Sequence, residues 1–438
     1  MGQGWRNSLP LIALLAGLAI PTVSAAQLTG AIGQPTQRLE RPEEVRPAAA
    51  RQAENYKPKG VALGAWLLYA EGAVDEVYND NIYATPSGTV GAFVQRIDPA
   101  VELRSNWNNH ALNFFAKGRV GLYSVDPGLN NYQDISVGGD GRLDVLRNWN
   151  VYGGASWNRR HEENGSPNTV TGVGLPITVY NQTSLNIGYF QKVNRISARV
   201  DGRFDNFTYQ NNGLGLAQGI IPNSDRDRNE WREGLRFGYE LTPGYEIWAR
   251  GGLNQRSYFQ LDPFGVNRSS TGFDIVGGVL IDLGSITSVE VFAGYMVQNY
   301  VSSLYGSIGF PTFGMKGYWN PVNQLWLKPF VQRTIEDSAF TTSAAFINTT
   351  FGVDVTYMLR PNLQVDGRAD YIIADYIPAA GTQGAPYEQY IGVRFGATYS
   401  PTERFFIVPS YQYLHRASNQ VNGDFNRSIV MLRLGARL

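Results

Sequence analysis

The stretch at 428–438, SIVMLRLGARL, alternates strictly between two kinds of side chain. Every second residue is apolar, and the positions between them include two arginines, Arg433 and Arg437. A period of two places each set on its own face of a β-strand. The stretch therefore predicts a strand with one apolar face and one charged face. The apolar set is Val430, Leu432, Leu434, Ala436 and Leu438.

The same alternation recurs along the chain from Val61 onward. VDVTYML at 353–359 and VEVFAGYMV at 289–297 are two of its clearest examples. Short, tight connections such as Arg147–Asn148 alternate with longer connections rich in Gly, Asn and Pro. These residue types are the ones that turns require.

Short turn, strand, long loop, strand is the pattern of an outer-membrane barrel, in which short turns face the periplasm and long loops face outside. We therefore predict an all-β fold, a transmembrane antiparallel β-barrel of about 18 strands. Sixteen strands is the alternative, because GAVDEV at 72–77 and residues 303–320 are difficult to divide into strands. A soluble sandwich or propeller also alternates. It is disfavoured because no blade motif repeats and because Tyr, Trp and Phe gather at the strand ends, as in membrane barrels.

The N-terminal part of the chain has a different composition. Arg6, an apolar run from Leu9 to Ile20 and the small residues that follow are typical of a cleavable signal peptide at 1–26. Residues 27–60 are rich in Pro, Ala, Arg and Glu and favour a flexible periplasmic extension. The barrel is expected to occupy 61–438. These segments predict a Sec-exported, integral outer-membrane protein of a Gram-negative bacterium.

Composition excludes several classes of function. The 37 basic and 37 acidic side chains balance, which argues against nucleic-acid binding, and the chain has no cysteine. None of the three histidines (His110, His161, His415) lies in a recognisable catalytic motif, so we expect no enzyme and no cofactor. The run DEVYNDN at 75–81 could offer oxygen ligands to calcium, but it lacks the spacing of a known calcium loop, so no metal site is predicted.

Charged side chains are expected on the inner face, since a charge facing lipid costs about 2–4 kcal/mol at the bilayer midplane. The tetrad G-R-x-D occurs three times, beginning at Gly141, Gly202 and Gly367. The charges could line a water-filled pore, or Arg and Asp neighbours could pair and brace the wall; for any single pair bracing is preferred. Mixed signs predict no strong ion filter. The predicted lumen-lining residues are Glu102, Arg104, Lys117, Arg119, Arg142, Asp144, Arg199, Asp201, Arg203, Asp205, Arg232, Arg236, Glu246, Arg250, Asp354, Asp366, Arg368, Asp370, Arg394, Arg433 and Arg437.

One region is more specific than a generic barrel. DNIY at 80–83 is followed by a strand of the form P-x-V-x-L-x-S-x-W at 99–107, and then by a tight turn containing His110. This region resembles the putative β-barrel porin family, whose members are often found with exopolysaccharide-synthesis machinery. The resemblance implies an outer-membrane component for polysaccharide export. The matching residues include Asp80, Asn81, Tyr83, Pro99, Ser105, Trp107 and His110.

Three functions remain open. A channel for exopolysaccharide secretion is the first, and inward aromatics could stack on its sugars: Trp248, Phe292, Trp326, Phe330 and Phe406. A general diffusion porin for small polar solutes is the second, and it would need an inward-folded constriction loop, for which 163–180 and 210–228 are long enough. An outer-membrane enzyme or a purely structural barrel is the third. Expected partners are outer-membrane lipid, the barrel-insertion machinery, the cargo and a periplasmic polysaccharide-export protein.

Overall fold

The computed structural model describes residues 56–167, 169, 174–213, 220–221, 223–284, 286–340, 342–381 and 384–438. The predicted signal peptide at 1–26 and most of the predicted extension at 27–60 lie outside these residues. Among the described residues, no helix has the length and apolar character needed to cross a membrane.

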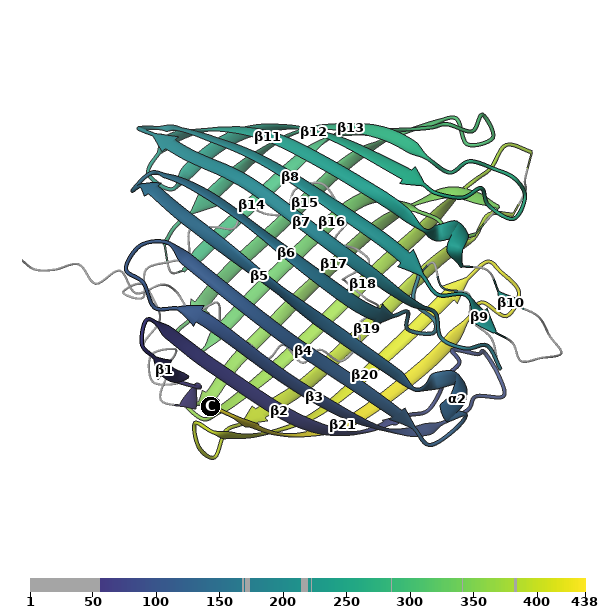
Figure 1. The fold of residues 1–438 in the computed structure, drawn as a ribbon, viewed down its shortest axis with the longest axis horizontal. Helices are drawn as coiled ribbons and strands as arrows, with labels where there is room; N and C mark the ends of the chain where they lie inside the picture. The colour runs from purple at the N-terminus through teal and green to yellow at the C-terminus, as the bar shows by residue number, and fades with distance from the viewer. Residues whose placement is uncertain are drawn as a thin grey trace, which may run out of the picture.

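Eighteen antiparallel strands form one closed barrel (Figure 1). The prediction of about 18 strands is therefore confirmed, and the alternative of 16 is wrong. Of the two regions that are difficult to divide, 72–77 lies within β2 and 303–320 contains most of β15. The strands are β2 (Trp66–Asn79), β3 (Ala92–Ser105), β4 (Ala111–Tyr123), β5 (Tyr132–Leu146), β6 (Trp149–His161), β7 (Val179–Val193), β8 (Ile196–Tyr209), β11 (Arg228–Thr242), β12 (Tyr245–Tyr258), β13 (Ser270–Asp282), β14 (Thr287–Tyr300), β15 (Ser307–Val322), β16 (Leu325–Asp337), β17 (Ser343–Arg360), β18 (Leu363–Pro378), β19 (Tyr387–Tyr399), β20 (Phe405–Ser418) and β21 (Phe425–Arg437).

The barrel closes between the first and last of these strands. β21 pairs with β2 from Asn79↔Ile429 to Glu71↔Arg437 without a register shift. Closure removes the free edges that an open sheet would leave unpaired in lipid. A short strand, β1 (Val61–Leu63), pairs only with β2 and stands outside the closed ring.

The two ends of the barrel differ in their connections. At one end, which we call the short-turn end, tight turns such as the one around Asn194 join the strands. At the other, the long-loop end, longer connections carry a short helix, α2 (Pro127–Asn130), a 3-10 turn, η4 (Ser224–Arg226), and a small hairpin of β9 (Asn212–Gly213) and β10 (Ile220–Ile221). Figure 1 shows α2, β9 and β10 together at that end.

Side-chain exposure follows the alternation predicted for β21. Leu432 and Leu434 are 45% and 52% exposed, whereas Met431 and Arg433 between them are 2% and 5% exposed. Exposed apolar side chains recur in the same way on the other strands, for example Ile187 on β7 and Ile275 on β13. The apolar face is therefore the outer face of the barrel, as a lipid environment requires.

Candidate functional site: the inner wall and the long-loop mouth

The three G-R-x-D tetrads have the same geometry. In each one the Arg and the Asp two residues later lie on the same face of the strand and form an ion pair. The nitrogen–oxygen distances are 2.9 Å for Arg142–Asp144, 2.7 Å for Arg203–Asp205 and 3.1 Å for Arg368–Asp370. In every copy, the two-residue spacing therefore places the Arg and the Asp in an ion pair within one strand.

Other pairs connect neighbouring strands. Arg433 donates to Asp75 of β2 at 2.7 and 2.8 Å and also contacts Asp98 of β3. Asp98 in turn accepts from Arg119 of β4 at 2.7 Å. One chain of charges therefore links four consecutive strands of the wall, β21, β2, β3 and β4. Because Asp75 and Arg433 are buried, loss of Arg433 would leave the Asp75 carboxylate uncompensated, and loss of Asp75 would leave Arg433 with Asp98 alone.

Most of the remaining predicted inner-face residues also contact partners. Within β3, Arg104 binds Glu102 at 2.6 Å. Further ion pairs are Arg199–Asp201, Arg236–Glu246, Arg250–Asp201 and Arg368–Asp354. Arg232 contacts both Glu230 and Asp205. Asp366 accepts from Thr356 and Gln364, Arg394 lies opposite Arg368 in the ladder, and Arg437 donates to the backbone oxygen of Tyr56. Lys117 is exposed.

Three of the five predicted inner aromatics lie beneath arginines. Arg236 lies over the Trp248 ring at 4.2 Å, Arg368 over Phe330 at 4.9 Å and Arg437 over Phe406 at 5.0 Å. These distances are those of cation–π contacts. Three of the five rings that were expected to stack on sugars are therefore in contact with the protein's own arginines.

The motif at 80–83 and the adjacent Ala84 form a buried loop on the inside of the barrel, which we call the inner loop. Asn81 is fully buried and its amide donates to the backbone oxygens of Thr85 and Asn426. Tyr83 donates its hydroxyl to Asp126 at 2.6 Å, and Asp80 accepts from the backbone of Ser428. The loop between β2 and β3 is thus fastened to β21 on one side and to the β4–β5 loop on the other.

The rest of the family motif lies at the short-turn end, except for Pro99 in the middle of β3. His110 adopts a positive φ of 63° and exchanges two hydrogen bonds with Asp144, each 3.0 Å long. The Ser105 hydroxyl accepts from Leu112, and Trp107 packs edge-on against Trp66. Pro99 lies opposite Gly72 within the β2–β3 ladder. These residues therefore act as turn and packing elements.

A second loop crosses the mouth to reach this motif. Asn164, in the loop between β6 and β7, donates to the backbone oxygen of Ile82 at 3.1 Å. Arg427 of β21 donates to the oxygens of both Asn81 and Asn164. Gly165 has a φ of 82°, and a side chain there would collide with Ala84 and Phe425. The β6–β7 loop consequently lies against a wall that is five strands away from its own.

Charges hold the base of the same loop. His161 lies within 3.0 Å of Asp134 and of Glu163, and its ring stacks on Tyr132. Burial alone would raise the pKa of the Glu163 carboxyl, but the hydrogen bond from His161 and nearby positive charges outweigh burial and lower that pKa to about 2. Glu162 forms a two-pronged ion pair with Arg226 of the next long loop, at 2.6 and 3.0 Å.

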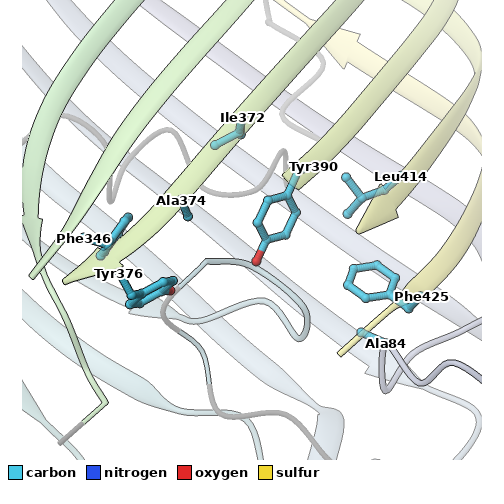
Figure 2. Close-up of a cluster of buried hydrophobic side chains, with 8 residues drawn as sticks. All are labelled: Ala84, Phe346, Ile372, Ala374, Tyr376, Tyr390, Leu414 and Phe425. Carbon is cyan, nitrogen blue, oxygen red and sulfur yellow. The ribbon is translucent and has the colours of Figure 1, made fainter. Parts of the chain in front are cut away.

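An apolar cluster fills the adjacent part of the mouth. Figure 2 shows Phe346, Tyr376, Tyr390, Leu414 and Phe425 on β17 to β21, with Ala84 of the inner loop beneath Phe425. Phe346 and Tyr376 stack with their ring centroids 4.8 Å apart. Apolar packing and charge pairing thus both hold loops inside the mouth.

Sequence reasoning did not identify several of these mouth residues. Arg427 directly precedes the alternating stretch 428–438, but its partners are backbone oxygens of distant loops. Glu162, Glu163 and Arg226 lie in loops, where a period of two gives no information. The candidate calcium run does not assemble either, because Asp75 faces Arg433 inside whereas Glu76 pairs with Gln95 on the exposed outer face.

A family model described as putative beta-barrel porin 2 matches residues 54–438. The chain belongs to this family. The resemblance seen in the sequence is thereby confirmed. No curated protein matches the chain.

Several solved outer-membrane proteins of Pseudomonas aeruginosa are similar in fold. OpdK has 10% identity, covering 85% of this chain and 99% of its own, with a TM-score of 0.44. OccD3 (OpdP) has 10% identity, covering 88% and 94%, with a TM-score of 0.41. The ferric enterobactin receptor PfeA has 7% identity, covering 84% and 80%, with a TM-score of 0.42.

Membership of the porin family and the closed ladder together identify an outer-membrane channel-type barrel. The class of protein is that of channels rather than enzymes. This assignment rests on the family match and on the strand pairing of the chain itself.

Proposed function

We propose that the barrel is a diffusion channel for small polar solutes. The observation that carries the proposal is the β6–β7 loop, which crosses the mouth and is held there by Arg427 and by the inner loop at 80–83. Its carboxylates Glu162 and Glu163 face arginines, which is the arrangement expected of a constriction. A narrow, polar opening suits small solutes better than a polymer.

The solute path is proposed to follow the charged inner face. Lys117 of β4 and Asp140 of β5 are exposed although they lie on that face, which supports contact with water inside the barrel. Most arginines of the wall are already paired with carboxylates, so the path is expected to discriminate weakly between anions and cations. Delivery by a Sec signal peptide and insertion by the barrel-assembly machinery belong to the same proposal.

Export of a polysaccharide, with a periplasmic partner, is the second candidate. The motif at 80–83 and 99–107 favours it through the resemblance to proteins found with exopolysaccharide-synthesis machinery. The arginines that lie over Trp248, Phe330 and Phe406 count against it, because they compete with sugars for these three rings.

Swelling of proteoliposomes in isotonic solutions of sugars tests the proposal. We expect fast swelling with monosaccharides, slower swelling with trisaccharides and none with a linear polysaccharide. Liposomes containing heat-unfolded protein are the control. Absence of swelling with every solute would overturn the channel proposal.

Deletion of the gene, with an assay of surface polysaccharide, tests the second candidate. Unchanged surface polysaccharide is the result expected of a small-solute channel. Its loss on deletion, restored by the wild-type gene, would replace the first candidate by the second.

A further inference from the structure

The ladder between β15 and β16 ends halfway along the strands. Its pairs run from Val322↔Leu325 to Gly314↔Gln332, and 307–313 of β15 form no ladder pair with β16, although the Thr312 side chain still contacts Arg333. On their other edges both strands remain paired, β15 with β14 to Ser307 and β16 with β17 to Asp337. The wall of the barrel therefore parts between two consecutive strands at the long-loop end.

Beyond this point β16 bends into the barrel. Tyr258 of β12 donates its hydroxyl to Asp337 at 2.8 Å, Arg256 of β12 forms an ion pair with the same carboxylate, and Tyr300 of β14 donates to it at 3.2 Å. Arg256 also donates to the backbone oxygen of Ile335. β12 and β16 are four strands apart, about 19 Å along a wall with strands about 4.8 Å apart. An arginine side chain cannot span that distance, so the tip of β16 has left the wall.

The outer face of β17 shows the same displacement. In the half of β17 nearer the short-turn end, the outer positions Phe351 and Tyr357 are 38% and 37% exposed. In the half nearer the long-loop end, the same face carries Ala345 and Ile347, which are 0% and 2% exposed, and the register from Ala345 to Tyr357 has no bulge. Something therefore covers this second half of a face that elsewhere meets lipid.

The cover is the neighbouring part of the wall. Ile335 and Ala345 pack with Met296 and Ile308, which lie on the inner faces of β14 and β15. On the opposite side, Phe346 and Ala374 pack toward the inner loop, where Ala84 lies (Figure 2). The tips of β16, β17 and β18 are thus enclosed between the wall and the inner loop. We call these tips, 333–337, 345–350 and 372–378, the flap.

Prolines lie on the two facing edges where the ladder stops. Pro311 of β15 and Pro329 of β16 cannot donate a backbone hydrogen bond, and proline in a sheet is confined to edges and irregular positions. The pairing is already interrupted beside Pro329, between Lys316↔Phe330 and Trp319↔Leu327. Gly314, the last paired residue of β15, provides a point at which the wall can part.

We propose that the flap is a gate of the channel, closed when Asp337 is bound by Arg256, Tyr258 and Tyr300. Its release returns β16 toward β15 and widens the long-loop mouth. The proposal rests on the channel function proposed above, and it adds the element that regulates the opening. The Asp337 carboxylate is the main contact that holds the flap closed, because three side chains of two wall strands converge on it.

The absence of cysteine from the chain allows a direct test. Ala374→Cys reports on the inner side of the flap and Ala345→Cys on its outer side, and both alanines are fully buried. Labelling with a membrane-impermeant maleimide is expected to be slow in the full-length protein. Adding Asp337→Asn should accelerate labelling at both positions at least about tenfold, since hydrogen bonds to a charged group are lost. Tyr258→Phe, which removes one hydroxyl, should have a smaller effect.

Glu240→Gln is the matched control, because it breaks the Lys192–Glu240 ion pair at the short-turn end and leaves the flap untouched. Single-channel conductance of Asp337→Asn in planar bilayers should exceed that of the wild type. Fast labelling in the wild type, or equally slow labelling in a folded Asp337→Asn variant, would overturn the flap. Faster labelling with unchanged conductance would overturn its role as a gate. If no variant and no wild-type protein conducts, the channel proposal fails, whereas the labelling result stands.

Discussion

Two seams of the barrel differ in a way that sequence distance does not suggest. β2 and β21, separated by more than 300 residues, pair without interruption and share the buried Arg433–Asp75 ion pair. β15 and β16, which are joined by a tight turn, separate at Gly314↔Gln332. The seam between the first and last strands, β2 and β21, is complete, whereas the seam between the consecutive strands β15 and β16 is open.

Closeness in sequence therefore does not decide whether a seam closes. β21 offers no proline to its partner, and its alternation is regular along the whole strand. β15 and β16 present Pro311 and Pro329 toward a shared edge. Where the ladder is broken, side chains replace it: the Thr312 hydroxyl donates to the backbone oxygen of Arg333 at 2.8 Å.

The largest effect is expected from a charge placed on the outer face of the closed seam between β2 and β21. Leu434→Arg should prevent assembly, since an arginine facing lipid costs about 2–4 kcal/mol near the midplane. The measurement is the heat-modifiable mobility of folded barrel on gels. Asn113→Arg is the control, because it places the same side chain on the inner face beside Asp140. Normal insertion of Leu434→Arg would mean that the outer face is wrongly assigned.

Loss of the ion pair should weaken the closed seam without abolishing it. Asp75→Asn leaves Arg433 buried without its main partner, and we expect a loss of about 3 kcal/mol in the free energy of unfolding, measured by denaturant titration in detergent. Glu76→Gln changes the adjacent carboxylate on the exposed face and should alter that free energy by no more than about 0.5 kcal/mol. Equal effects of the two substitutions would show that the seam does not depend on this pair.

Hydrogen exchange should distinguish the two seams in the unmodified protein. Peptides from 307–313 and 333–337 are expected to exchange faster than peptides from 71–79 and 429–437, because about half of the amides on an unpaired edge strand lack a ladder partner. Mass spectrometry after deuterium labelling measures the difference. Equally slow exchange at both seams would contradict the opening between β15 and β16.

The smallest expected effect concerns pH at the mouth. The Glu163 pKa is about 2 when the β6–β7 loop is docked and has its ordinary value of 4.5 when the loop is free. The free loop then binds more protons, so docking is stable above about pH 4.5 and weakens as the pH falls toward 2. A nitroxide on Leu175→Cys should become more mobile over that range. With Glu163→Gln its mobility should no longer change with pH, and a persistent change would assign the transition to another group.

Much of the fold could be predicted because alternation is local. The strand at 428–438, the tight turns and the count of about 18 strands all follow from a period of two and from turn residues. The difficulty at 303–320 had a physical cause. Pro311 and the glycines of β15 interrupt the usual composition of a strand, and the same residues mark the place where the wall opens.

The candidate site was predictable only where partners are close in sequence. Arg and Asp two residues apart on one strand must share a face, so the pairs of the three G-R-x-D tetrads could be foreseen as braces. The contacts of Arg427 with Asn81 and Asn164, and of Arg256 with Asp337, join segments dozens to hundreds of residues apart. No local pattern identifies such partners.

The sequence by itself determined which side chains face lipid and which face inward, because a β-strand leaves each residue one of two faces and lipid rejects charge. Only the tertiary structure decided what fills the mouth. Loop docking and the inward bend at Asp337 depend on curvature, on a broken ladder and on partners four or five strands away. These are properties of the closed barrel as a whole, and they exist only once all 18 strands are in place.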